Sequence, residues 1–356
     1  MRDTDSLIER GEKPPPLARA STSMAALLGP APTNFVNYDA ELWLPTVRAS
    51  FSSMSQFVLY PWLSLTTMTF FLASFAHLFE SPPWWATIPP FAHTVLGGAL
   101  SFLMVFRTNT AYSRWWEARL MWGQVTIGCR NIVAQSGAMM ADTPARLELL
   151  SLLMAFPITL KNALRDEPTK SSELSQAEAL ATEAQQEGKP ALRKLCAAPS
   201  APLVLLEAIS RSIRSGINTQ PSMQLASTAY LHLSEEVRSL TMAATACERI
   251  KTSPMPLGYV SALRAFLLLW LFSLPLTMVG PYGHAAAPAV ATIAFLFLNL
   301  ENVALEIEQP FGRDANDLPL ETYCNGIERA ILNVLRFDAT AGPEGPSGGE
   351  SSGGEM

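Results

Sequence analysis

Three long stretches without a formal charge constrain the fold of this 356-residue chain more than any other feature. Asp, Glu, Lys and Arg are all missing from residues 57–79, 81–106 and 265–300. A helix needs about 20 residues to cross roughly 30 Å of hydrocarbon, so the third stretch is long enough for two crossings. A Gly-Pro-Tyr-Gly turn signal at 280–283 divides it near its middle. We therefore predict four transmembrane helices, with approximate spans of 57–79, 86–106, 258–279 and 285–303.

The overall composition agrees with this prediction. The chain is 49% hydrophobic and 16% charged, against about 25% charged residues in an average soluble domain. We expect an all-α integral membrane protein in which the four transmembrane helices are joined to a helical inner domain. A buried core helix is the alternative for one span, above all for the second, because Pro89 and Pro90 lie near its start.

The positions of the basic residues predict how the spans are oriented. The short loops at 80–85 and 280–284 contain neither Lys nor Arg. Residues 107–130, directly after the second span, contain one acid, Glu117, and four arginines: Arg107, Arg114, Arg119 and Arg130. Since positive charge collects on the inner side of a membrane, we place 107–257 and both termini on the cytoplasmic or stromal side. The abrupt change at Arg107 also indicates that one helix leaves the membrane there and continues into water.

A helical inner domain is predicted over 107–257. The segment 145–165 is apolar, but its ends are basic and Pro157 interrupts it, so we favour a buried helix over a fifth span. Residues 167–202 are rich in Ser, Ala, Glu, Gln and Lys and contain four prolines. This composition predicts a flexible surface insert that contributes little to the core.

The two ends of the chain differ from the rest. The first 20 residues carry acids and no apolar run, so we expect 1–44 to be a partly disordered segment that is neither a secretory signal nor a transit peptide. Residues 338–356 consist largely of Gly, Ser, Pro and Glu, which predicts a disordered tail. One membrane domain at 45–337 lies between them.

Several functional classes find no support in the sequence. Metalloprotease spacing and Gly-rich phosphate loops are absent, as is a Gly-x-Ser-x-Gly elbow, so we predict no enzyme activity. The widely spaced cysteines predict neither a disulfide framework nor a zinc site: Cys129, Cys196, Cys247 and Cys324. A net charge of −6 without a strongly basic stretch predicts no nucleic-acid partner.

The second span carries a seam of evenly spaced residues. Gly98, Phe102 and Phe106 are four positions apart and fall on one helical face, and Asn109 and Ser113 continue this face past the predicted membrane exit. If several subunits surrounded an axis, the two phenylalanines would form apolar rings of the kind that gate by dewetting. Phenyl edges carry partial positive charge and favour an anion over a cation. From spacing alone, phenylalanines that face lipid or a neighbouring helix are the favoured alternative.

Three further motifs resemble those of a known family. They are Arg114-Trp115-Trp116 after the second span, the segment 247–259 before the third, and Pro-Phe-Gly at 310–312 followed by Asn-Asp-Leu-Pro at 316–319. In order and spacing, over roughly 45–337, these motifs resemble the bestrophin family of anion channels, in its bacterial and plant forms.

The resemblance implies a homopentamer around one axial pore that passes chloride, with bicarbonate or nitrate as further candidates. It assigns the pore neck to Gly98, Phe102 and Phe106, and Asn109 and Ser113 become candidates for the pore entrance. The family's second constriction, the cytosolic aperture, would fall near Thr228 and Leu231. Gly98 departs from the aliphatic residue of many relatives, so the outermost ring of the neck would be wider.

The segment after Pro-Phe-Gly is a weak calcium candidate. Animal bestrophins have an acid-rich calcium clasp here, whereas this chain offers Asp314, Asn316 and Asp317, with Arg313 and Ala315 interrupting the acids. Calcium takes roughly six to eight oxygen ligands, which these three side chains do not supply. We therefore predict no bound metal, no other cofactor and no calcium-dependent gate, and favour turn formation or helix capping for the two aspartates.

Acids near the end of the last span leave two interpretations open. Glu301, Glu306 and Glu308 could lie on the ion path, or they could be solvated or paired with basic residues, and the second is the commoner case at a membrane boundary.

Two rival functions also stay open, a non-conducting membrane scaffold and an anion carrier. A carrier is expected to show discontinuous helices in two related halves, and the proline-bearing third span has no evident counterpart. The expected partners are membrane lipid, monovalent anions and further copies of the chain. A plasma membrane and a chloroplast thylakoid are equally compatible with the sequence.

Overall fold

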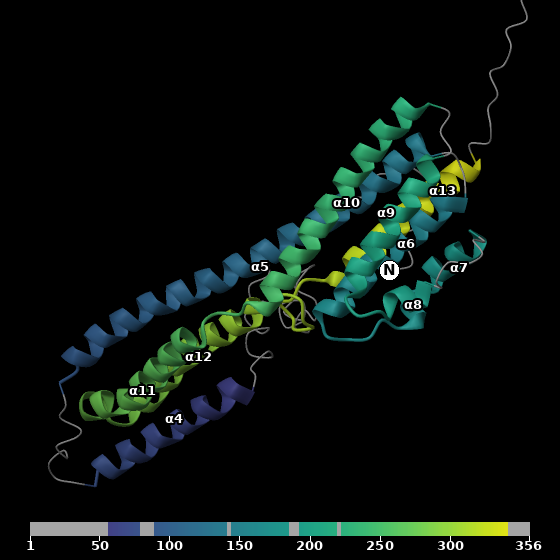
Figure 1. Cartoon of the computed structure of the whole chain (residues 1–356). Coiled ribbons are helices and arrows are strands. Elements are labelled where there is room, and N and C mark those ends of the chain that lie inside the picture. Colours follow the sequence, from purple (N-terminus) through teal and green to yellow (C-terminus); the bar gives the residue numbers. More distant parts are fainter. Residues whose placement is uncertain (1–55, 79–88, 141–143, 185–191, 219–221, 341–356) are drawn as a thin grey trace, which may run out of the picture.

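One helix extends through the whole molecule and joins its two halves (Figure 1). The computed structural model describes residues 56–78, 89–140, 144–184, 192–218 and 222–340. Within these ranges the chain is helical and contains no strand. The long helix is α5 (Phe91–Met139), whose 49 residues correspond to about 74 Å at 1.5 Å per residue.

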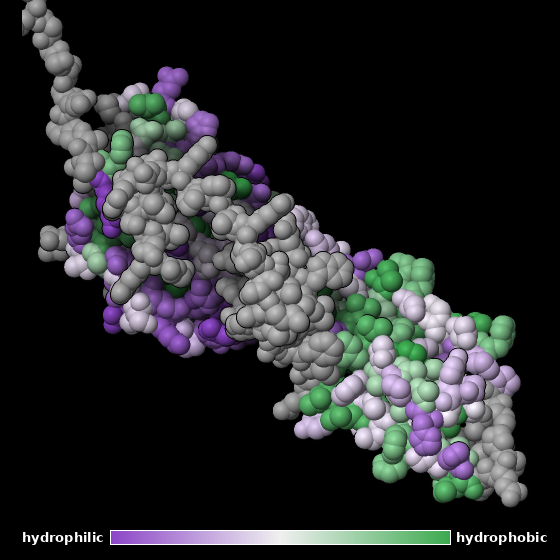
Figure 2. Space-filling view, turned by 180° about the vertical axis from the view of Figure 1, so that it is seen from behind, coloured by the Kyte–Doolittle hydropathy of each residue, from purple (hydrophilic) through white to green (hydrophobic). Residues whose placement is uncertain are grey.

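The membrane half contains α4 (Gln56–Ala76), the first part of α5, α11 (Leu257–Tyr282) and α12 (Ala286–Glu308). Helices long and apolar enough to cross a membrane cover α4 from Val58, α5, and the α11–α12 hairpin from Leu257 to Glu308, which agrees with a membrane domain of four transmembrane helices. In the second span, 22% of the apolar window is buried, so the alternative of a buried core helix is wrong. Figure 2 shows hydrophobic residues gathered at this end of the molecule and hydrophilic residues at the other.

Helix α5 leaves the membrane half without a break, as the sequence predicts. Two of its glycines let other helices approach closely. A Cβ atom at Gly97 would lie 2.8 Å from the Trp270 ring of α11, and one at Gly128 would lie 2.8 Å from the Leu240 side chain of α10 (Met223–Thr252). A larger residue at either position would force the facing side chain to shift within the packed core.

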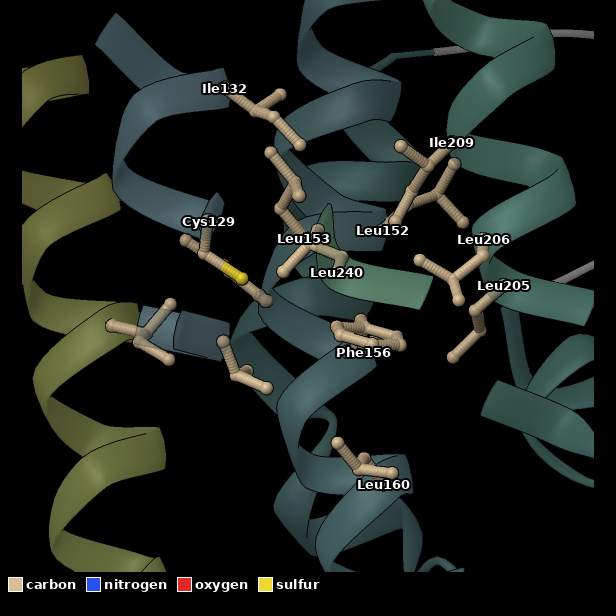
Figure 3. Close-up of a cluster of buried hydrophobic side chains, with 14 of the residues drawn as sticks. Cys129, Ile132, Leu152, Leu153, Phe156, Leu160, Leu205, Leu206, Ile209 and Leu240 are labelled. Atoms are coloured by element: carbon tan, nitrogen blue, oxygen red, sulfur yellow. The ribbon is translucent and has the colours of Figure 1, made fainter. Parts of the chain in front are cut away.

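The inner half is built around α6 (Pro144–Leu164), which packs against α5, α9 (Ala201–Ile217), α10 and α13 (Leu320–Thr340). Phe156 and Leu160 of α6 are fully buried, and Figure 3 shows Phe156 between side chains of α9 and α10. Although α6 is apolar enough to span a membrane, 83% of its window is buried inside the protein. The prediction of a buried helix here is confirmed.

The prediction that 167–202 contributes little to the core is wrong for the described part of that segment. It forms a 3-10 turn at Ser171–Glu173, α7 (Ser175–Glu183) and α8 (Leu192–Cys196). Leu174, Leu180 and Leu192 are buried in the inner core. The apolar residues are few, but helical spacing places them on one face, and the polar majority covers the outside.

The predicted ends of the membrane domain can be compared with the structure only in part. Residues 1–55 and 341–356 lie outside the described residues, and so do the proposed N-terminal segment and most of the proposed tail. Helix α13 continues to Thr340, so the predicted tail begins three residues too early at 338. All four cysteines are buried free thiols, which agrees with the absence of a disulfide framework.

Candidate functional site

The predicted seam of α5 lies on a face that no other described part of the chain covers. Gly98, Phe102, Phe106, Asn109 and Ser113 are all exposed. Further exposed residues continue the face into the inner half: Trp116, Leu120 and Ile127. The opposite face of the helix is buried against the rest of the molecule through Leu100, Met104, Arg107, Ala111, Ala118 and Trp122. The chain therefore leaves one continuous stripe of its longest helix without a partner.

The two phenylalanines of the seam contact each other rather than the core. Their ring centroids lie 4.6 Å apart with an angle of 90° between the ring planes, an edge-to-face contact. Phe102 is 63% exposed and Phe106 is 49% exposed, so neither is a core residue of the single chain. A Cβ atom at Gly98 would meet nothing within 4 Å, and this position is open as well. Their assignment to a pore neck stays a prediction.

The seam becomes polar one turn below Phe106. The hydroxyl of Ser113 donates to the carbonyl of Asn109 at 2.9 Å, and Thr110 donates to the carbonyl of Phe106 at 2.8 Å. These hydroxyl protons are therefore used within the helix. The side-chain amide of Asn109 has no protein partner within the described residues and is exposed, so its two N–H groups are available to a ligand.

The aperture candidates lie far from the neck. Thr228 and Leu231 are exposed on α10, which runs antiparallel to α5 in the inner half (Figure 1). The amide of Asn131 donates to Glu236 at 3.1 Å, and this register places Thr228 and Leu231 beside the last turns of α5. At 1.5 Å per residue, that is about 45 Å below Phe106 along α5. The two predicted constrictions are therefore at opposite ends of the exposed stripe.

A buried ion cluster lies directly below the neck. Arg107 follows Phe106 and is fully buried. Its Nη2 atom donates to Glu308 at 2.8 Å, and its Nε atom lies 3.5 Å from Glu301. Glu301 also accepts a hydrogen bond from Arg264 of α11 at 2.8 Å. Of the interpretations left open for the acids at the end of α12, pairing within the subunit applies to Glu301 and Glu308.

Arg114 fastens α5 to the ends of two other helices. Its guanidinium donates to the carbonyls of Ile250 and Ser253, each at 2.6 Å, and to the carbonyl of Glu308 at 3.2 Å. These carbonyls belong to the C-terminal ends of α10 and α12, where helices leave acceptors unpaired and carry partial negative charge. The sequence places Arg114 at the membrane exit and in the Arg-Trp-Trp motif, but nothing local in the sequence indicates its three distant acceptors.

Two of the three calcium candidates, Asn316 and Asp317, have hydrogen-bond partners within the subunit. The side-chain amide of Asn316 donates to Glu306 of α12 at 2.6 Å, and the backbone carbonyl of Asn316 accepts from the Trp115 indole at 2.9 Å. The Asp317 carboxylate accepts from the backbone N–H of Asp314 at 2.6 Å, which confirms turn formation. Burial raises the pKa of Asp317 to about 7, although the hydrogen bond from the Asp314 backbone opposes this effect. No group of three metal-ligating side chains occurs among the residues that the structure describes.

Comparison with known proteins gives one consistent result. The chain is 34% identical to a voltage-dependent anion channel-forming protein of Nostoc sp., over 68% of this chain and 78% of the relative. It is 30% identical to a protein of the same description in Escherichia coli, over 74% of this chain and 84% of the relative. A solved structure of a mutated bacterial bestrophin homologue from Klebsiella pneumoniae is 26% identical, with a TM-score of 0.65, and the match covers 78% of this chain and 98% of that one.

The family profile described as "Bacterial/Fungal Bestrophin protein" matches residues 36–333. This range includes all four spans, the inner helices and the loop after α12. It also includes the three motifs on which the resemblance in the sequence depends. The chain belongs to the bacterial and fungal bestrophin family.

Proposed function

We propose that this protein is an anion-selective channel, a homopentamer with the exposed stripe of α5 facing a central pore. The observation that carries the proposal is the stripe itself, which is apolar at Phe102 and Phe106, polar at Asn109, and continuous from the membrane half into the inner half. Relatives in Nostoc and Escherichia coli are described as forming voltage-dependent anion channels. The same family membership confirms that the chain is not an enzyme.

The exposed stripe lies on the surface of the described part of one subunit and does not enclose a path for an ion by itself. Identical head-to-tail contacts around an axis close such a surface into a ring. Because α4 packs against α11 and α12 on the side away from α5, a ring with α5 innermost has α4 at its periphery, toward lipid (Figure 1). The number of five subunits rests on the resemblance to bestrophins.

The chemistry of the stripe suits a weakly hydrated anion. Rings of Phe102 and Phe106 would narrow the pore with apolar surface, which holds water poorly and gates by dewetting. The positive edges of the phenyl groups tolerate an anion better than a cation. Below them, the free N–H groups of Asn109 would hydrogen-bond an anion that has lost part of its water. Chloride is the permeant ion we propose, with bicarbonate and nitrate as further candidates.

Two measurements on the purified protein test this proposal. Native mass spectrometry in mild detergent should show five copies of the chain in one complex. In a planar bilayer with a potassium chloride gradient, unitary current steps should reverse near the chloride equilibrium potential. A scaffold would give no current, and a carrier would give no unitary steps. Monomers or dimers in every mild detergent, or reversal near the potassium potential, would contradict the proposal.

We also propose that the channel does not require calcium. Asn316 and Asp317 are occupied by contacts within the subunit, and a carboxyl whose pKa is raised to about 7 is partly protonated at neutral pH. Current should therefore persist when a chelator removes calcium from both sides of the bilayer. The variant Asp317→Ala should respond to calcium and chelator in the same way as the wild type. Activation by micromolar calcium that disappears in this variant would show that the loop is a calcium site.

A further inference from the structure

A cavity of about 420 Å³ lies between α4, α11 and α12, on the side of the membrane half away from the free face of α5. Its walls are mostly apolar and include Pro61, Leu267, Leu268, Leu298 and Leu305. Its polar lining residues are Arg264, Glu301 and Asn302. Both charged residues lie about two turns from the inner ends of their helices, since α11 begins at Leu257 and α12 ends at Glu308. The cavity therefore has its polar end near the inner membrane boundary.

Arg264 has unused hydrogen-bonding capacity at this polar end. Its Nε atom donates to Glu301 at 2.8 Å, and its side chain is 41% exposed. Within the described residues its two terminal nitrogens have no protein acceptor. A charged side chain at the edge of the hydrocarbon region is costly unless it finds a partner or reaches the headgroups. The terminal nitrogens of a guanidinium match the oxygens of a phosphate, to which they can donate two parallel hydrogen bonds.

We propose that this cavity binds one glycerophospholipid of the inner leaflet. The phosphate accepts hydrogen bonds from the terminal nitrogens of Arg264, and an acyl chain lies along the leucines of α11 and α12. A phospholipid is favoured over a soluble anion because most of the cavity wall is apolar and because α4 lies on the side away from α5. A free phosphate would leave that apolar wall without a partner.

The site is linked to the candidate pore by one shared carboxylate. Glu301 accepts from Arg264 through one oxygen and lies 3.5 Å from Arg107 through the other. Arg107 directly follows Phe106 in α5. A phosphate bound to Arg264 weakens the hydrogen bond between Arg264 and Glu301. Glu301 then interacts more strongly with Arg107. Lipid occupancy then changes the ion pairing of Arg107 below the neck. This effect on the neck rests on the proposed channel function, whereas lipid binding itself does not.

The test measures phospholipid binding to the full-length protein by native mass spectrometry. Delipidated wild type is titrated with palmitoyl-oleoyl-phosphatidylglycerol, and Arg264→Gln should bind roughly tenfold more weakly, the effect of losing a charge-assisted hydrogen bond. Arg264→Lys keeps the positive charge and should retain most of the affinity. Glu301→Gln leaves Arg264 in place and should bind at least as well as the wild type. Inorganic phosphate at millimolar concentration should not displace the lipid.

Arg211→Gln is the matched control, because Arg211 is 75% exposed on α9 in the inner half and forms only a surface pair with Glu207. It should bind lipid as the wild type does. Equal phospholipid affinity of wild type and Arg264→Gln would overturn the proposal. Equal losses of affinity in Arg264→Gln and Glu301→Gln would also overturn it, because they would indicate a general effect on structure. If wild type binds no added phospholipid, the cavity has another occupant, such as residues before Gln56, and the proposal is wrong. If the protein binds lipid through Arg264 but conducts no ions, the lipid-site proposal stands and the channel proposal is wrong.

Discussion

Phe102→Ala and Phe106→Ala should each raise the unitary conductance or open probability severalfold and weaken discrimination among anions. Each change removes an apolar ring from the proposed neck and lowers the dewetting barrier. The protein should still fold, because residues 63% and 49% exposed lose little packing on truncation. We expect a loss of about 1 kcal/mol or less, against about 3 to 5 kcal/mol for a buried phenylalanine. Reversal potentials under chloride, bromide and nitrate gradients measure the selectivity at matched oligomer yield.

Two other phenylalanines provide the controls for this experiment. Phe71 is 69% exposed on the peripheral helix α4, so Phe71→Ala should change neither stability nor selectivity. Phe156 is fully buried in the inner core, and Phe156→Ala should lower stability and yield while any current that remains keeps its selectivity. Wild-type selectivity in both neck variants, combined with a loss of stability like that of Phe156→Ala, would assign Phe102 and Phe106 to packing.

The spans and the exposed seam could be predicted from the sequence because each is encoded locally. An uncharged run of about 20 residues has few alternatives to a membrane-crossing helix, and residues four positions apart share a face of any helix. The change at Arg107 from uncharged to basic residues, without a turn signal, was enough to predict that α5 continues into the inner half.

The insert and the ion cluster could not be predicted, because both depend on contacts between distant parts of the chain. Residues 167–202 are mostly polar, and their few leucines become core residues only by packing against α6 and α9 in the folded protein. Arg107 and Glu308 are 201 positions apart, and a sequence does not show that such residues meet. The raised pKa of Asp317 likewise arises from burial that only the folded loop provides.

Arg107→Met should destabilise the protein by about 3 to 5 kcal/mol, because it leaves Glu308 buried without its partner and removes one of two cations beside Glu301. Glu308 would keep only the backbone N–H of Met255, at 3.2 Å, as a donor to its other oxygen. Methionine is apolar, unbranched and flexible, so it fills much of the space that the arginine stem leaves, and the lost charge dominates the effect. Thermal unfolding of the detergent-solubilised oligomer, followed by tryptophan fluorescence, measures the change.

The double variant Arg107→Met with Glu308→Gln separates the destabilisation caused by an unpaired buried charge from that caused by changed packing. The glutamine carries no charge, and Glu301 still holds Arg264, so the second change should restore roughly 2 kcal/mol of the loss. Arg211→Met is the matched control, since its exposed pair with Glu207 should contribute less than about 1 kcal/mol. If Arg107→Met is as stable as this control, the cluster below Phe106 does not hold α5 to α12. The neck would then need another support, because Arg107 is the residue that connects the turn after Phe106 to Glu301 and Glu308 of α12.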